Sequence, residues 1–586
     1  MRQDIAAPYL FDGAFSTYYK TLYGGGEPAD FACLSHPENV RRVHRDYIDA
    51  GAQAIKTNTF GVNAVLVPDS DIRKELVLAG WEIACRAADG RADVFADIGF
   101  IAADDELSAP MYLELAEWFL QCGCTRFLFE TQEAFAPLVP ALELIKSRCA
   151  GATVIVSFAV AQDGYSGQGL SVHTLTRAAA ESGLADAAGI NCVCGPQHSL
   201  DIISRLTLKE GVMLTVMPNA GYPALLMGRS DFSHSADYYA QKMGEIYLSG
   251  AQILGGCCGT EPSHIRQTAQ TLKSLQAEGN RPALGRKNQS AFSAKPNAFV
   301  QKLSTYSPVF AVELNPPKNA DFSFISEAAR RAKVHGADII TVTDSPMSRP
   351  HADCLLTSAK IKREAGIDVL PHLSCRDRNQ IAIKGGLLSL AGEGIDNLLI
   401  ITGDPIVQTD SAGFKGVFSF NSVRLLRYIS SLNAELFASR PFAPGAALNT
   451  GAKNFDEELK KAVRKTEAGA QFFLTQPVFT EREAGNLMRA RRELGTPVLG
   501  GIMPVTSYKS AVYLTNEVHG ITVPEELSDR LKDASPERAR GIALEFCKGI
   551  SDMLRGNVEG YYLLTPGKNI EIICSLMKYI KSGCSA

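Results

Sequence analysis

The chain has 586 residues, of which 46% are hydrophobic and 21% charged, and its formal net charge is −4. One hydrophobic core stops growing at roughly 250 to 300 residues, so we expect at least two globular domains. The near-neutral charge excludes the basic surface of nucleic-acid binders, and no nucleic-acid partner is expected. Because the sequence shows neither a signal peptide nor an apolar run of about 18 residues, we expect a cytoplasmic protein that does not bind a membrane.

Short apolar segments alternate with helix-like stretches through the first half of the chain. One helix is recognisable in detail, because Pro37 begins it and Gly51 ends it. Its side chains Val40, Val43 and Tyr47 fall on one face. The expected strands are residues 9–11, 52–57, 93–98, 126–129, 153–158, 188–191, 212–217 and 251–254. Eight strand–helix units in this length predict a (β/α)8 barrel.

The same alternation resumes after a polar stretch rich in glycine, proline and basic residues, residues 276–300, which we interpret as a linker. The second set of expected strands is 309–314, 339–342, 369–373, 398–401, 446–448, 472–474, 498–502 and 561–564. The predicted fold class is α/β, with two successive (β/α)8 TIM-type barrels over residues 1–275 and 301–586. The alternative, one larger domain with an extended surface loop, is less favoured because the alternation restarts at once.

The chain has 14 cysteines, too few for a disulfide scaffold, so a cluster of them indicates metal binding or catalysis. Cys192 closes the sixth expected strand, and Cys257 and Cys258 close the eighth. Chemistry in such barrels lies where strands end, and three thiolates leave one position of a tetrahedral zinc site open. A string of Gly-Gly-Cys-Cys-Gly-Thr is poor core material, so we favour metal ligands over core cysteines. Cys194 and His198 are left out, since a fourth ligand would close the site.

The first half resembles the homocysteine S-methyltransferase family. The matching segments are Asp12–Ala14, Ala50–Ala52, Thr57–Phe60, Glu130–Thr131, Gly189–Cys192, Pro218–Gly221 and Gly255–Thr260. The resemblance implies that Cys192, Cys257 and Cys258 bind Zn²⁺ and that homocysteine is methylated to methionine. It also implies that Glu130 contacts the amino group of homocysteine and that Asp12 helps to hold the amino acid. The methyl donor stays open among 5-methyltetrahydrofolate, S-methylmethionine and S-adenosylmethionine.

Polar residues also end the strands expected in the second half. They are Glu313, Thr343–Asp344, His372, Asp404, Asn449 and Gln476. Carboxylates at two rim positions suit proton donation and charge stabilisation, provided that the surroundings keep one of them protonated. A single carboxylate is usually a solvated loop residue, but placement at successive strand ends favours a functional role.

The second half is similar to the methylenetetrahydrofolate reductase family. The matching segments are Glu313–Pro317, His372–Cys375, Gly403–Pro405, Ala468–Ala470, Leu474–Phe479 and Gly501–Pro504. The similarity implies that Glu313 is the general acid, that Asp404 stabilises the cationic folate, and that Gln476 binds the pterin of methylenetetrahydrofolate. His372 and Lys465 match positions that contact a flavin, with FAD favoured.

The second half departs from the common NADH-dependent reductases at several positions. Thr343–Ser345 stands in place of Thr-Tyr-Gly, Thr402 in place of arginine, and 564–566 in place of Thr-Leu-Asn. The electron donor therefore stays open between NAD(P)H and an electron-donor protein. The sequence does not indicate the oligomeric state.

The favoured interpretation is a bifunctional enzyme, with one barrel making 5-methyltetrahydrofolate and the other methylating homocysteine. A first alternative is a homocysteine methyltransferase that uses S-methylmethionine or S-adenosylmethionine and carries a folate- or flavin-binding sensor or docking domain. A second is a non-catalytic zinc-binding interaction protein.

Overall fold

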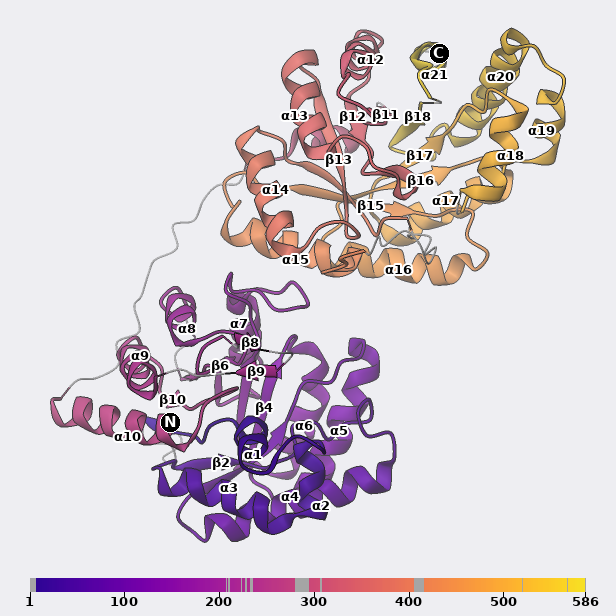
Figure 1. Ribbon diagram of the computed structural model, residues 1–586. Coiled ribbons are helices and arrows are strands. Elements are labelled where there is room, and N and C mark those ends of the chain that lie inside the picture. The colour runs from indigo at the N-terminus through magenta and orange to yellow at the C-terminus, as the bar shows by residue number, and fades with distance from the viewer. Residues whose placement is uncertain are drawn as a thin grey trace. The chain divides into compact units, whose positions relative to one another are not determined.

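A computed structural model describes all residues except 1–6, 207, 209–210, 223, 227–228, 232–234, 280–294, 306–307, 405–415, 519, 566 and 585–586. The chain divides into two compact units, Met1–Ser290 and Ala291–Ala586, each of which is a barrel of strands surrounded by helices (Figure 1). Most of the expected linker, residues 280–294, lies outside the described residues. Helix α10 (Pro262–Ala277) precedes it and α11 (Ala298–Leu303) follows it.

The N-terminal unit is an eight-stranded parallel barrel, as predicted. Its strands are β1 (Tyr9–Leu10), β2 (Ala54–Lys56), β3 (Asp93–Ile98), β4 (Arg126–Gln132), β5 (Thr153–Phe158), β6 (Ala187–Asn191), β7 (Met213–Met217) and β10 (Ile253–Leu254). They pair in the order β1-β10-β7-β6-β5-β4-β3-β2. A parallel bridge between Phe11 and Ala54 joins the two end strands. Backbone bonds on either side of it, Gln53 N to Leu10 O at 2.7 Å and Asp12 N to Ala54 O at 3.0 Å, complete the closure.

Helices cover the outside of this barrel (Figure 1). They are α1 (Phe15–Tyr23), α2 (Ala32–Ser35), α3 (Pro37–Asp49), α4 (Ser70–Ala88), α5 (Asp105–Gln121), α6 (Val139–Arg148), α7 (Val172–Ser182), α8 (Pro196–Ile203), α9 (Ala236–Leu248) and α10. Helix α3 agrees with the sequence, because Pro37 begins it and Val40, Val43 and Tyr47 are fully buried. Gly51 follows it at φ 105°, a left-handed conformation that glycine adopts without strain. A short antiparallel hairpin, β8 (Ala224–Leu226) and β9 (Arg229–Asp231), lies between β7 and α9.

The C-terminal unit is a closed parallel barrel, again as predicted. Its strands are β11 (Val309–Leu314), β12 (Ile339–Val342), β13 (Asp368–Ser374), β14 (Asn397–Ile401), β15 (Ala443–Leu448), β16 (Phe472–Pro477), β17 (Val498–Ile502) and β18 (Gly560–Leu564). Large side chains, among them Leu370, Leu399, Phe472 and Leu499, fill its interior. The barrel is therefore packed, and chemistry must take place at its mouth.

Helices also surround the second barrel. They are α11, α12 (Ser323–Val334), α13 (Cys354–Ala365), α14 (Gln380–Gly392), α15 (Ser422–Glu435), α16 (Phe455–Glu467), α17 (Glu481–Leu494), α18 (Tyr508–Glu517), α19 (Glu525–Leu531), α20 (Pro536–Leu554) and α21 (Ile570–Cys584). Three of them, α18 to α20, lie in the long connection between β17 and β18. A separate apolar cluster that includes Phe479, Val505, Ile521, Leu527 and Leu531 packs them against the barrel.

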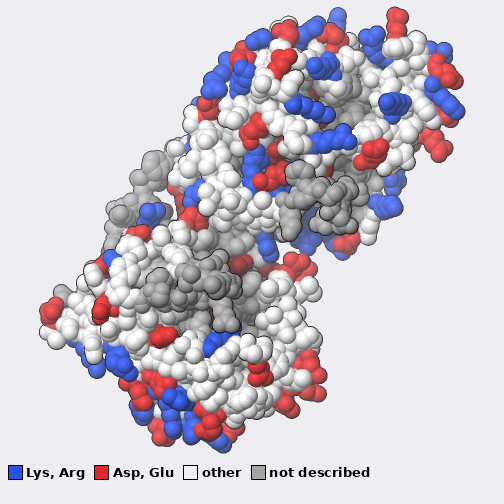
Figure 2. All heavy atoms as spheres, viewed as in Figure 1, with Lys and Arg blue, Asp and Glu red and all other residues white. Residues whose placement is uncertain are grey.

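Acidic and basic side chains are intermixed over the visible face of each unit (Figure 2). This distribution agrees with the net charge of −4 and shows no continuous basic stripe on that face. Among the described residues, no helix combines the length and the apolar character needed to cross a bilayer.

Candidate active sites at the mouths of the two barrels

Three cysteine sulfurs meet at the mouth of the N-terminal barrel. Cys192 follows β6, Cys257 and Cys258 follow β10, and their Sγ atoms all lie within 4.8 Å of one another. The Sγ atoms of Cys192 and Cys258 are 3.7 Å apart. Cys194 is not part of the group, because its thiol is buried and contacts the Val160 carbonyl at 3.3 Å. Three sulfurs at this spacing form a donor set that suits a soft or borderline cation.

Backbone hydrogen bonds fix the loop that carries the cysteine pair. Cys257 N donates to Pro218 O at 2.9 Å, and Ala220 N donates to Cys258 O at 2.9 Å. The Thr260 hydroxyl donates to Cys257 O at 2.7 Å. Gly256 lies so close that an added Cβ would be 2.3 Å from the Thr260 Oγ1 atom, so only glycine fits there. The glycine-rich string is therefore a close-packed loop that holds two adjacent thiols in place.

A buried cluster of opposite charges lies in the same barrel. The Lys56 Nζ atom is 3.4 Å from Glu130 Oε2 and 3.8 Å from Asp12 Oδ1. It also donates to Gly256 O at 3.4 Å, directly beside Cys257. Burial raises the pKa of Asp12 to about 7, and the charge of Lys56 opposes that shift. Burial and then the charge of Glu130 hold the pKa of Asp97, the third acid of the cluster, well above its usual value.

Asn191 connects the acidic cluster to the cysteines. Its Oδ1 atom accepts a hydrogen bond from Thr131 N at 2.7 Å, which fixes the side chain. Its Nδ2 atom donates to Glu130 Oε2 at 3.5 Å and lies 4.0 Å from the Sγ atom of Cys257. Glu130 and the sulfurs therefore belong to one site.

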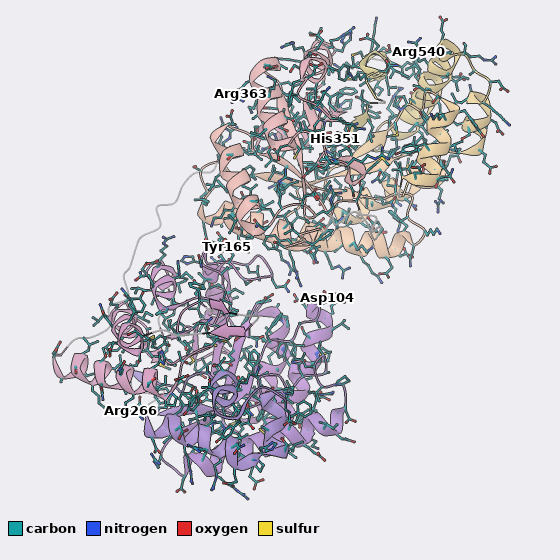
Figure 3. The ribbon with its side chains drawn as sticks, viewed as in Figure 1. Asp104, Tyr165, Arg266, His351, Arg363 and Arg540 are labelled. Carbon is teal, nitrogen blue, oxygen red and sulfur yellow. The ribbon has the colours of Figure 1, made fainter. Side chains whose placement is uncertain are left out.

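Several buried polar atoms of this barrel have no hydrogen-bond partner among the described residues. Among them are Asp97 Oδ1, Ser157 Oγ, Thr215 Oγ1, Asn219 Oδ1 and Asp12 Oδ1, the last of which faces Lys56 at 3.8 Å but accepts no hydrogen bond. Unpaired buried polar atoms cost free energy, and a polar ligand that pairs with them removes that cost. Figure 3 labels two residues of loops that follow strands of this barrel, exposed Asp104 after β3 and buried Tyr165 after β5.

The C-terminal barrel opens into a cavity of about 740 Å³ at the ends of its strands. Four of the predicted residues line it, namely Glu313, His372, Asp404 and Gln476. The fifth, Lys465, lines a smaller neighbouring cavity of about 120 Å³ that Gln476 also borders. The Lys465 Nζ atom donates to Ala447 O at 2.7 Å, and burial lowers its pKa.

Glu313 has a neutral hydrogen-bond donor and no ion-pair partner among the described residues. Burial in the barrel raises the pKa of its carboxyl to about 7. The hydroxyl of Tyr562, which also lines the cavity, donates to Glu313 Oε2 and opposes that shift. Glu313 therefore keeps a proton to near-neutral pH, as a general acid requires.

Asp404 is held by the loop that follows β12. Its Oδ2 atom accepts a hydrogen bond from Met347 N at 2.7 Å. Ser345, Met347 and Ser348 have φ values of 45°, 57° and 57°, a region that favours glycine, so this loop is strained. Arg376 is 2% exposed and ties the loop to Asp404, donating to Ser348 Oγ at 2.8 Å and to Asp404 O at 3.1 Å.

His372 and Asp344 have different surroundings within the same cavity. Burial lowers the pKa of His372 to about 3, and its Nε2 atom has no partner among the described residues. The imidazole is therefore neutral and available to a ligand. Asp344 accepts from Ser374 N at 3.1 Å and forms an ion pair with Arg378, which also binds Asp353 at 2.7 Å. The negative charge of Asp344, which lies in a segment that departs from the common reductases, is thus balanced by Arg378.

Four residues of these sites received no role from the sequence, namely Lys56, Asn191, Arg376 and Tyr562, although Asn191 lies in the matching segment Gly189–Cys192. Lys56 could have been predicted from the sequence. A lysine within an apolar strand of a barrel is buried, and a buried lysine needs an acidic partner. The others acquire their roles only through partners that lie far away in the sequence.

Family models match both units. The model of the family "Homocysteine S-methyltransferase" matches residues 9–272, and that of "Methylenetetrahydrofolate reductase" matches residues 298–577. The chain joins one domain of each family. The methyltransferase domain belongs to a transferase family and the reductase domain to an oxidoreductase family.

Curated relatives match parts of the chain. Over 265 residues, or 41% of this chain, there is 29% identity to "Methionine synthase" of Mycobacterium tuberculosis, of which 22% is covered. Over 214 residues, or 33% of this chain, there is 30% identity to "Methylenetetrahydrofolate reductase 2" of Schizosaccharomyces pombe, of which 33% is covered. The chain thus spans about a fifth to a third of the length of these relatives.

Solved structures of the homocysteine methyltransferase MmuM from Escherichia coli match the chain. The metallated form shows 22% identity and a TM-score of 0.37, over 46% of this chain and 96% of that protein. The apo form shows 26% identity and a TM-score of 0.34, over 46% of this chain and 97% of that protein.

Proposed function

We propose that the methyltransferase domain transfers a methyl group to homocysteine at a zinc ion bound by Cys192, Cys257 and Cys258. The observation that carries this proposal is the convergence of three sulfurs within 4.8 Å at the barrel mouth. Three thiolates fit Zn²⁺ and leave a fourth position for a substrate sulfur. When bound, the zinc supplies a Lewis acid that lowers the pKa of that sulfur.

The acidic cluster next to the sulfurs gives this proposal its substrate. Glu130 and Asp12 are buried carboxylates near the three cysteines. Homocysteine carries both a thiol and an ammonium group on one short chain, so it can reach the metal site and the carboxylates at once. We assign the ammonium group to Glu130, which Asn191 holds beside Cys257. Asp12, whose Oδ1 atom has no hydrogen-bond partner, helps to hold the amino acid.

For the reductase domain we propose reduction of 5,10-methylenetetrahydrofolate to 5-methyltetrahydrofolate. Glu313 donates a proton to the ring nitrogen whose bond to the methylene carbon breaks, which its raised pKa supports. Asp404 stabilises the positive charge that then develops on the folate, and Gln476 binds the pterin. His372 and Lys465 would contact a flavin, with FAD favoured, and the reduced flavin would supply the hydride.

A chemical relation links the two activities, since the product of the reductase reaction carries a methyl group on nitrogen. We propose that this methyl group is the one transferred to homocysteine. S-methylmethionine and S-adenosylmethionine are the competing donors. NADH, NADPH and a protein are the competing sources of electrons.

Metal analysis and a visible absorption spectrum of the full chain test both halves together. We expect one zinc ion per chain and the absorption of an oxidised flavin. Homocysteine methylation by metal-free protein would contradict the zinc site. Failure to retain any flavin after reconstitution with FAD and FMN would contradict the reductase proposal and favour a sensor or docking role.

A further inference from the structure

Tyr562 and Glu313 project into the same barrel from neighbouring strands. Strands β11 and β18 pair in parallel, and Tyr562 lies opposite Ala311 in their register. Glu313 is two residues beyond Ala311 and therefore points to the same, inner side of the barrel. There the hydroxyl of Tyr562 donates a hydrogen bond to Glu313 Oε2.

Apolar surroundings strengthen this hydrogen bond. The ring of Tyr562 is 6% exposed and belongs to the interior cluster that includes Leu370, Leu399 and Leu499. A hydrogen bond in such a low-dielectric interior is electrostatically stronger than one in water. Among the described residues, no second side chain donates to Glu313, so its orientation depends on Tyr562.

No other titratable group of the cavity replaces Tyr562. Asp344 is paired with Arg378, and burial keeps His372 neutral. Asp404 accepts from the backbone of Met347, and the hydroxyl of Tyr513, which also lines the cavity, contacts the Sδ atom of Met347 at 2.9 Å. Glu313 is thus without a buried cation, and the charge that it acquires on losing its proton must be stabilised by the phenol.

We propose that Tyr562 positions Glu313 for proton donation and stabilises the carboxylate that donation leaves behind. This inference rests on the proposed reduction of methylenetetrahydrofolate. The proton passes from Glu313 to the folate nitrogen, and the electron pair of the broken carbon–nitrogen bond stays on that nitrogen. Tyr562 keeps its own proton and donates its hydrogen bond to the new carboxylate.

The pKa values agree with this division of roles. Burial first, and then the charge of Glu313, hold the pKa of Tyr562 well above its usual value, so the phenol does not act as the acid. For Glu313, burial raises the pKa and the hydrogen bond from Tyr562 lowers it. Removal of the hydroxyl must therefore raise the pKa of Glu313 further.

A matched pair of variants tests the proposal in the full flavin-loaded chain. Tyr562→Phe removes the inner hydroxyl, and Tyr561→Phe makes the same change at the next residue. Tyr561 faces the other side of the strand, where its hydroxyl donates to Ser551 O at 3.2 Å. The rate of folate reduction by pre-reduced flavin is measured from about pH 5 to about pH 9, and so is the rate of flavin reduction.

We expect Tyr562→Phe to slow folate reduction roughly 10- to 100-fold at its plateau, because a charged hydrogen-bond acceptor loses its donor. The alkaline limb of its pH profile should move to higher pH, and flavin reduction should stay unchanged. Tyr561→Phe should behave as the parent. A profile of Tyr562→Phe that overlays the parent profile, or one that is lower at all pH values without a shift, overturns the proposal.

Direct titration of Glu313 keeps the test independent of turnover. The infrared band of the protonated carboxyl group can be followed against pH, with Glu313→Gln as the blank. We expect a higher midpoint in Tyr562→Phe than in the parent and in Tyr561→Phe. Equal midpoints overturn the inference about Tyr562. If Tyr562→Phe raises the midpoint as expected but the parent does not reduce the folate, only the proposed function is contradicted.

Discussion

The two barrels place carboxyl groups at the same rim of the same fold but surround them differently. In the methyltransferase domain, Lys56 lies 3.4 Å from Glu130 and 3.8 Å from Asp12, so a buried cation faces the acids. In the reductase domain, Glu313 receives a hydrogen bond from neutral Tyr562 and has no ion-pair partner among the described residues. Glu130, with a cation at 3.4 Å, is suited to bind an ammonium group, whereas Glu313, without one, is suited to give up a proton.

The largest effect is expected from removing one cysteine of the cluster, which should inactivate the methyltransferase domain and leave the reductase domain unchanged. Cys257→Ala should abolish zinc binding and methyl transfer and leave flavin binding intact, since only two sulfurs remain. Cys194→Ala is the control, because Cys194 is near in sequence but contacts Val160 O instead of the cluster. Zinc content, methyl transfer and flavin absorbance are measured on the same preparations. Loss of flavin binding in Cys257→Ala would show that the two sites are not independent.

Substitution of Glu313 should slow the reduction of the folate by the flavin but not the reduction of the flavin itself. Glu313→Gln should slow folate reduction by roughly 10² to 10⁴, the usual contribution of a general acid, while flavin reduction stays near the parent rate. In the parent, folate reduction should fall as pH rises through about 7, because the proton-bearing form of Glu313 is lost there. Stopped-flow measurement of both half-reactions checks this. Equal losses in the two would contradict the role of Glu313.

A smaller effect is expected from removing the buried cation of the other barrel. Lys56→Met keeps most of the length of the side chain but leaves Glu130 and Asp12 facing each other without a counter-charge. We expect zinc to be retained and the KM for homocysteine to rise roughly 10-fold, with a smaller change in kcat. Lys146→Met, which breaks the 2.6 Å pair with Asp186, is the control for loss of a partly buried lysine.

A thiol without the amino group sharpens the Lys56 test. The parent should bind homocysteine much better than 4-sulfanylbutanoate, its analogue without the ammonium group. Lys56→Met should discriminate between them less than the parent does, because the acids are no longer held for an ammonium group. Unchanged discrimination would mean that Lys56 only stabilises the fold.

The sequence predicted the strands well because each barrel strand is a short apolar run between turn signals. The bounds of β3, β5, β11, β12 and β17 are the same in the sequence prediction and the structure. The hairpin of β8 and β9 was not predicted, because its strands of three residues are too short to show a pattern. The cysteine cluster was predictable from a local string, since two of its three members are adjacent.

The partners of the site residues were not predictable, because they pair across the barrel. Lys56 meets Glu130 over a separation of 74 residues, and Tyr562 meets Glu313 over 249. Only closure of the barrel brings β18 next to β11, and no local pattern contains that information. The sequence therefore placed these acids at strand ends but could not indicate the groups that determine whether each acid is paired.

The smallest effect is expected on the free energy of unfolding of the reductase domain. It tests, without any substrate, whether the surroundings of Glu313 keep a proton on it. The usual pKa of a glutamate, 4.5, applies to Glu313 in the unfolded chain, and the folded value is about 7. The folded state thus holds the proton more tightly, and its stability must fall as pH rises from 4.5 to 7. Glu313→Gln removes this loss and should gain on the order of 1 kcal/mol over the parent above neutral pH, because the carboxyl group still opens on the cavity.

Urea unfolding of the full chain, followed in the reductase domain, measures this difference at acidic and alkaline pH. Exposed Glu457, which pairs with Lys460 at 2.9 Å, provides the control, and Glu457→Gln should show no gain at alkaline pH. If Glu313→Gln also shows none, the barrel does not hold a proton on Glu313. The contrast with the paired acids of the methyltransferase domain would then lie in geometry alone, and proton donation would have to come from another group of the cavity.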